Sequence, residues 1–170
     1  LTDTTLTFFK PTGNYNIGIG GYTLDALTTG HSNVALGYNA LTAATDGNSN
    51  VCIGRNAGQS ITGAGGAVAI GYAALATEDA SGTSVAVGYT ALEDQNVNSN
   101  ANVAVGYKSL LGTTSGQKNT AIGYKSGENL TTGGNSVMIG NEAGNGVSTT
   151  FYHVLIGDHA GHKTLSDHGS

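Results

Sequence analysis

Apolar residues recur along the chain in a short, repeated pattern. A β-branched residue or leucine is followed by a small residue, a second β-branched residue or leucine, and then glycine, as in VALG at 34–37 and VAVG at 85–88. A spacing of two places the larger residues on one face of a strand and the small residue on the other. The pattern predicts a series of short strands, each ended by a glycine.

The pattern returns at a fixed interval. Its glycine occurs nine times, and seven of the eight intervals are 17 residues while one is 18. We number the repeat from its first residue (Asn16, Asn33, Asn50 and so on), so that the glycine is position five. A period this regular is typical of proteins in which each repeat stacks on the last. The sequence predicts a repeat domain over 16–170, preceded by a lead-in segment over 1–15. The nine glycines are Gly20, Gly37, Gly54, Gly71, Gly88, Gly106, Gly123, Gly140 and Gly157.

The rest of the repeat favours a coil over a helix. Glycine at a fixed place and β-branched residues at period two both argue against a helical repeat. Position eight is always small, position nine is always leucine or glycine, and polar turn residues follow. We expect an all-β parallel β-solenoid in which nine coils, about 4.8 Å apart, build a rod of roughly 40 Å.

The larger apolar residues form two columns, at positions two and four. So short a coil holds few apolar side chains, so stability must also come from association of chains. We therefore expect these columns to pack in the interior of the coil or between the chains of an oligomer. They comprise Val34, Leu36, Val51, Ile53, Val68, Ile70, Val85, Val87, Val103, Val105, Ile122, Val137 and Ile139.

Composition removes several functional classes. The 170 residues include only 10% charged residues, with a formal net charge of −5, and the six Lys and Arg residues are scattered. No basic cluster is available to neutralise nucleic-acid phosphates, so nucleic acid is not an expected partner. No window is apolar enough for membrane insertion, and the first residues lack the form of a signal peptide.

The repeats resemble two known families. NTAIGYKSGENLTTGGNS (119–136) and NIGIGGYTLDALTTGHSN (16–33) look like the repeats of phage and prophage tail-fibre proteins, and the N-[ST]-V-A-[IL]-G form resembles the head repeats of trimeric autotransporter adhesins. The resemblance implies a left-handed parallel β-roll, a homotrimer, and attachment to a cell-surface glycan or outer-membrane protein. The tyrosine after glycine favours a segment of a virion tail fibre; the alternative is a bacterial surface adhesin head.

Two features are candidates for receptor binding. Tyr72, Tyr89, Tyr107 and Tyr124 occupy position six of four successive repeats, so a solenoid aligns them in one ladder. The ladder serves either as a stacking device, which we favour, or as an aromatic stripe for a cell-surface sugar. The extra residue of the 18-residue interval must fall in a turn near Asn96 and Asn98, and such surface loops often carry binding residues.

Catalytic and metal-binding patterns are weak. The acidic pairs Glu78-Asp79 and Glu93-Asp94 lie in turn regions, where a solvated loop surface is a better explanation than catalysis or cation binding. Histidines gather near the C-terminus, and His153, His159 and His162 are weak candidates for a metal site, with surface exposure as the alternative. Cys52 replaces a buried alanine. We expect a non-enzymatic protein without a cofactor.

Overall fold

The computed structural model of the chain describes residues 13–63, 65–78, 83–95, 101–149 and 151–161. Within these ranges the chain forms nine strands of three residues each and no helix. Every strand occupies positions two to four of one repeat, as the apolar pattern predicts. The strands are β1 (Ile17–Ile19), β2 (Val34–Leu36), β3 (Val51–Ile53), β4 (Val68–Ile70), β5 (Val85–Val87), β6 (Val103–Val105), β7 (Thr120–Ile122), β8 (Val137–Ile139) and β9 (Val154–Ile156).

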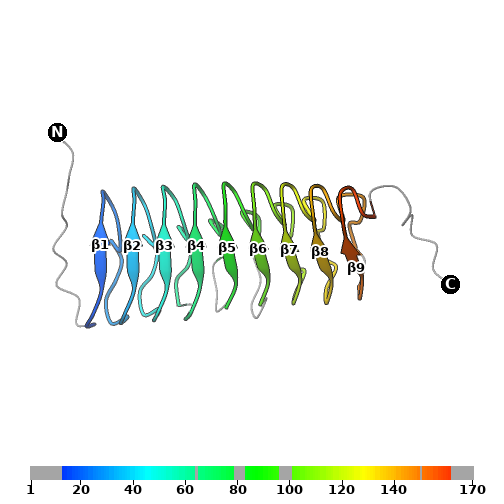
Figure 1. The fold of residues 1–170 in the computed structure, drawn as a ribbon. Helices are drawn as coiled ribbons and strands as arrows, with labels where there is room; N and C mark the ends of the chain where they lie inside the picture. Colours follow the sequence, from blue (N-terminus) through cyan, green and yellow to red (C-terminus); the bar gives the residue numbers. More distant parts are fainter. Residues whose placement is uncertain (1–12, 64, 79–82, 96–100, 150, 162–170) are drawn as a thin grey trace, which may run out of the picture.

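The strands form a single parallel sheet in which each pairs with the next one along the chain (Figure 1). Pairing joins identical positions of successive repeats, so that Val51 lies opposite both Val34 and Val68. Parallel neighbours cannot be joined by a tight hairpin, and the rest of each repeat therefore travels round and returns to the sheet. The prediction of an all-β solenoid with one coil per repeat is confirmed.

The 18-residue interval leaves the sheet in register, because Val85 of β5 pairs with Val103 of β6. Hydrogen bonds locate the extra residue. The amide of Asp94 donates to the carbonyl of Leu111, 17 residues on, whereas the equivalent amide of Ala43 donates to Gln59, only 16 residues on. The side chain of Gln95 still bonds that of Glu78, at the same position of the coil before. The extra residue therefore lies between Gln95 and Asn102, as predicted, and residues 96–100 are outside the described ranges.

Each strand turns its middle residue, at position three, inward. Ala35, Cys52 and Ala69 are fully buried, while their neighbours at positions two and four are half-buried or exposed. Larger residues, Met138 and Leu155, occupy position three in the last two coils, where glycine at position nine leaves room for them. Of the two places expected for the β-branched columns, the coil interior is excluded, and packing between chains stays a prediction. We call the strand residues at positions two and four the outer face.

The interior is filled mainly from the opposite wall of the coil. Leucine at position nine is fully or almost fully buried in five coils. Where position nine is glycine, a larger residue at position twelve takes its place: Ile61 accompanies Gly58, and Leu130 accompanies Gly127. Conversely, Ala44 accompanies Leu41. In these three coils the two positions keep a similar interior volume through different pairs of residues, whereas the coils of Leu24 and Leu75 carry a large buried residue at both positions, with Leu27 and Glu78 at position twelve. The five leucines are Leu24, Leu41, Leu75, Leu92 and Leu110.

Asparagine at position one explains another fixed feature of the repeat. The side-chain oxygen of Asn33 accepts a hydrogen bond from the backbone amide of Asn50 at 3.0 Å, and the side-chain amide of Asn33 donates to the carbonyl of Gly47 at 2.8 Å. Asn102 and Asn119 make the same pair of bonds in later coils. A buried backbone group needs a partner, and here one side chain supplies it across coils.

Glycine at position five has two reasons to be invariant within the repeats. At Gly71 the backbone φ is +135°, a conformation that residues with a side chain rarely adopt. A β-carbon there would also lie 2.2 Å from the carbonyl oxygen of Gly88 in the next coil. The coils can therefore approach each other at this corner only if no side chain is present.

Candidate functional site

The tyrosine ladder begins directly after the glycine corner, at position six. Rings of Tyr72, Tyr89, Tyr107 and Tyr124 stack in series, with centroids 5.0, 5.5 and 5.2 Å apart and interplanar angles of 13°, 16° and 7°. The predicted ladder is confirmed as a geometric feature. Each ring remains between 41% and 48% exposed, so one edge of the stack is available to solvent or to another molecule.

The column continues beyond the four stacked rings. The guanidinium of Arg55 lies 5.6 Å from the ring centroid of Tyr38, a cation–π contact at the N-terminal end of the ladder. At the other end, the side chain of Asn141 donates to Asp158 at 2.8 Å. Position six thus carries contacts between successive coils on either side of the four rings, from Arg55 to Tyr38 and from Asn141 to Asp158.

The outer face is an extended apolar surface. Its side chains at positions two and four remain partly exposed on all nine strands, and Leu36 and Ile122 are among the more exposed. Nine strands about 4.8 Å apart, and roughly 7 Å from position two to position four, give an area on the order of 300 Å². This is within the range of the largest apolar patches that single soluble chains expose, which are often interaction sites.

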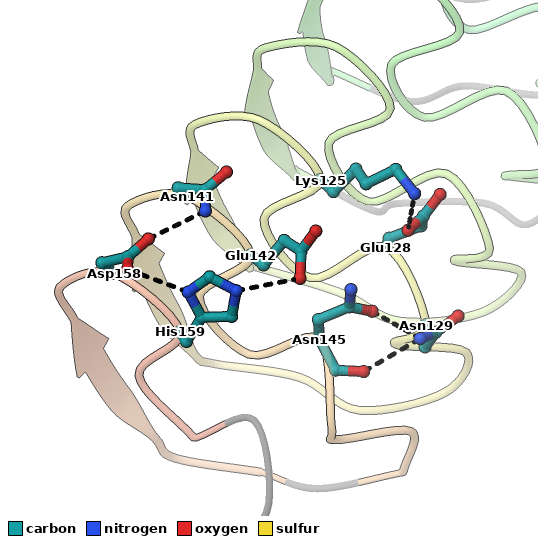
Figure 2. Close-up of polar contacts among 8 residues, drawn as sticks. All are labelled: Lys125, Glu128, Asn129, Asn141, Glu142, Asn145, Asp158 and His159. Atoms are coloured by element: carbon teal, nitrogen blue, oxygen red, sulfur yellow. Dashed lines mark hydrogen bonds and ion pairs between the residues drawn. The ribbon is translucent and has the colours of Figure 1, made fainter.

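Of the three histidines predicted as weak metal ligands, the structure describes His153 and His159. His159 lies between two carboxylates: its Nδ1 is 2.9 Å from Asp158 and its Nε2 is 3.3 Å from Glu142 (Figure 2). His153 begins the last repeat, its backbone amide donating to Ser136, and His162 is outside the described residues. In the described part of the chain no group of three Asp, Glu, His or Cys residues is arranged to hold a metal ion.

The carboxylates around His159 change its protonation. A hydrogen bond with Asp158 raises the pKa of His159 above its usual 6.5, with a smaller contribution from the charge of Glu142. Hydrogen bonds from Asn141 and His159 lower the pKa of Asp158 below its usual 3.8. The imidazole therefore keeps its proton to higher pH than an ordinary histidine, and it joins Asp158 to Glu142 of the coil before.

Further polar contacts lie on the wall beside this cluster. Within one coil Lys125 lies 3.3 Å from Glu128, and the side-chain amide of Asn129 donates to Asn145 in the next coil (Figure 2). The hydrogen bond with Glu128 raises the pKa of Lys125. These side chains have their partners within the chain.

One member of a predicted acidic pair, Glu78, lies in the interior of the coil. Glu78 was expected on a solvated loop but is fully buried, because position twelve points into the coil as it does for Ile61. Gln95, one coil further on, donates its side-chain amide to Glu78 and to Ser84. Asp79 is outside the described residues. Glu93 is half-buried, and desolvation, together with the charge of Asp94, raises its pKa.

Two other predicted residues have different outcomes. Cys52 is fully buried, and burial raises the pKa of its thiol to about 12; it is therefore unreactive, as its small-residue position suggests. Asn96 and Asn98 lie outside the described residues, so their part in binding stays a prediction. None of the described residues belongs to a helix long and apolar enough to span a bilayer.

Sequence reasoning missed one hollow in the surface. The Phe151 groove has a volume of about 290 Å³ and spans positions fourteen, sixteen and seventeen of three successive repeats. Its only sequence signal is Phe151, a large aromatic at a position where the other described repeats have glycine or a polar residue. The groove is lined by Ser115, Gln117, Lys118, Thr132, Gly134, Asn135 and Phe151.

Comparison of the chain with protein-family models, with curated proteins and with solved structures finds no match.

Proposed function

We propose that the chain is a non-enzymatic segment of an attachment fibre, in which three copies associate side by side and present a receptor-binding surface to a cell. In our proposal the solenoid is a left-handed β-roll and the fibre is a phage tail fibre; a bacterial trimeric adhesin head is the alternative. The outer face is the observation that carries the proposal.

The outer face supports lateral association because of its form. Its apolar residues lie in straight columns along the whole sheet, whereas the interior of each coil is already filled by alanine and leucine. A surface with one chemistry along its full length suits a partner of the same length and spacing, and another copy of the chain has both. The apolar area that one chain leaves exposed is what association would remove from water.

The tyrosine ladder adjoins the outer face, and two roles remain for it. In the first, its exposed edge packs against the neighbouring subunit, with the hydroxyls reaching water. In the second, it forms an aromatic stripe for a cell-surface sugar. The uninterrupted stacking of four rings favours the first role, since a receptor site would be expected to single out one place.

Light scattering of the purified chain at micromolar concentration tests the assembly, and a trimer is the expected result. Val103→Asp and Ile122→Asp each place an unpaired charge in the outer face, at a cost of several kcal/mol once it is buried between chains. Both variants should dissociate while keeping their β circular-dichroism signal, because these side chains are outside the coil interior.

A control variant separates surface from interior. Ala104→Asp puts the same charge on the buried side of β6 and should unfold the coil itself. A folded wild-type monomer at micromolar concentration contradicts the proposal, as does an undiminished trimer in both outer-face variants. Attachment is tested by binding of the labelled trimer to bacterial cells, with the dissociated variants as controls for avidity.

A further inference from the structure

The Phe151 groove is held by backbone pairing between coils. Gly134 and Phe151 form a parallel bridge, and the backbone amide of Tyr152 donates to the carbonyl of Gly134 at 3.1 Å. The backbone amide of Asn135 donates to the carbonyl of Gln117 at 3.0 Å. Position seventeen adopts a left-handed backbone, with φ of 58° at Lys118 and 56° at Asn135. These contacts fix the lining residues on three consecutive coils.

Glycine creates the hollow between two larger residues. Gln117, Gly134 and Phe151 occupy position sixteen in succession, so the column has a gap in its middle. A β-carbon at Gly134 would lie 3.3 Å from ring atoms of Phe151, so the ring packs over the glycine backbone. The ring itself remains 51% exposed and offers an apolar surface next to the gap.

The polar side chains of the groove differ from those around them. In the same coils, Thr113, Asn119, Ser126 and Thr131 bond the backbone of another coil. Among the described residues, the side chains that line the groove have no hydrogen-bond or ion-pair partner within the chain. Their donors and acceptors are available to a bound molecule. They are Ser115, Gln117, Lys118, Thr132 and Asn135.

We propose that the Phe151 groove binds a pyranose residue that carries a carboxylate. An aromatic face next to a small hollow accommodates the apolar C–H face of one sugar ring. Two amides and two hydroxyls supply both donors and acceptors, which vicinal sugar hydroxyls require. Lys118 supplies a positive charge for the carboxylate in a chain whose net charge is −5.

This site deepens the proposed function, on which it rests, by naming the class of receptor sugar and placing it away from the tyrosine ladder. Position sixteen comes just before the strand and position six just after it, so the groove and the ladder border the outer face at opposite ends of the strands.

The test measures binding of matched monosaccharides to the intact protein by calorimetry or ligand-observed NMR. Methyl glucuronide and methyl glucoside differ only in the carboxylate, and a sialic acid glycoside provides a second acidic ring. We expect saturable binding of at least one acidic sugar and weaker binding of the glucoside. Phe151→Ala should weaken binding of the acidic sugar and of the glucoside by about tenfold, the loss expected for one aromatic stacking contact.

Further variants separate the charge from the ring. Lys118→Gln should remove the preference for the acidic sugar while leaving the glucoside unchanged, and Gln117→Ala should weaken both sugars without touching the Phe151 packing. Tyr15→Ala and Lys108→Gln are matched controls outside the groove and should have no effect. Melting curves of each variant confirm that it is folded.

Three results would overturn the proposal: no saturable binding of either acidic sugar, equal binding of the glucoside and glucuronide, or acetate competing as well as glucuronide, which would indicate an anion site without sugar recognition. Binding unchanged in both Phe151→Ala and Lys118→Gln would also overturn it. Trimer formation and cell attachment, measured separately, report on the proposed function. A trimer that attaches to cells equally well with either groove variant would refute the groove and leave the fibre intact.

Discussion

Ile61 occupies the space that a side chain on Gly58 would need: a β-carbon at Gly58 would lie 2.9 Å from Cδ1 of Ile61. One coil earlier the arrangement is reversed, with Leu41 at position nine and Ala44 at position twelve, all fully buried. In these two coils, two side chains three residues apart therefore share one volume, which is filled in two different ways.

Gly58→Leu should consequently destabilise the fold. The new side chain would meet Ile61 and also Cys52, whose Sγ lies 2.6 Å from the β-carbon position. Overpacking of this kind typically costs about 1–3 kcal/mol in free energy of unfolding. The triple variant Cys52→Ala, Gly58→Leu, Ile61→Ala copies the neighbouring coil and should recover most of the loss in denaturant titrations. A triple variant no more stable than the single one would refute the shared volume.

Removing two rings of the tyrosine ladder separates its two roles. Tyr89→Ala with Tyr107→Ala eliminates all three stacked contacts, each worth about 0.5–1.5 kcal/mol. If the ladder is structural, the melting temperature of the assembly falls, and this is the expected result. Tyr152→Ala, which removes an exposed tyrosine outside the ladder, serves as the control. Unchanged melting with loss of cell attachment would assign the ladder to the receptor.

The extra residue between Gln95 and Asn102 should be dispensable for the fold. Deleting Asn98, outside the described residues, restores the 17-residue interval while leaving the pairing of Val85 with Val103 possible. Changes of loop length cost little compared with loss of strand pairing. Deleting Ala104 instead shifts the register of β6 and should unfold several coils. Equal losses of stability for the two deletions, measured by thermal melting, would contradict the loop assignment.

The contacts of His159 predict a pH dependence at the last coil. Because its folded pKa is raised above 6.5, protonated His159 contributes stability that is fully present below pH 6.5 and is lost as pH rises through the folded pKa. Asp158, whose pKa is lowered, contributes stability above pH 3.8 that is lost as pH falls through its folded value. The contact is therefore strongest between these limits. Its effect on global stability should be small, since the groups are on the surface.

NMR titration of the imidazole measures this directly. Asp158→Asn should lower the pKa of His159 towards 6.5, because it removes the hydrogen-bonding carboxylate. Glu142→Gln should lower the pKa less, since the charge of Glu142 is a smaller cause. A titration of His159 that is identical in the wild type and both variants would show that the three side chains do not meet in solution.

Much of the fold can be predicted from the sequence because its interactions repeat. The strand boundaries, their register and the tyrosine ladder follow from the period and from the β-branched pattern alone. Which face of the strand points into the coil does not follow from the period and the pattern. Hydrophobicity argues that Val51 and Ile53 should be inside and Ala35 or Cys52 outside, yet the coil is too narrow for large residues on both walls. Leucine at position nine already occupies much of the interior. The width of the coil, which decides how much room remains, cannot be read from any local sequence pattern.

The site was less predictable for a related reason. The residues around Glu78 are of the kinds found in turns, which predicts exposure. Its burial becomes evident only once the side chain at position twelve is seen to point into the coil. The Phe151 groove requires three residues at one position in three coils, with Gly134 between two larger neighbours. Each of these residues is ordinary by itself, and their juxtaposition becomes visible only when the repeats are stacked.

Each strand residue pairs with its equivalent one repeat later, so the length of the rod is set by the number of repeats. A segment such as 68–84 can be removed or duplicated as a unit. Removal would pair Val51 with Val85, and duplication would pair the first Val68 with the second, so that valine meets valine in both cases. The reach of the rod is therefore quantised: each added repeat extends it by one strand spacing of about 4.8 Å. Selection for a longer or shorter reach would need only unequal recombination between repeats, with no new packing solution.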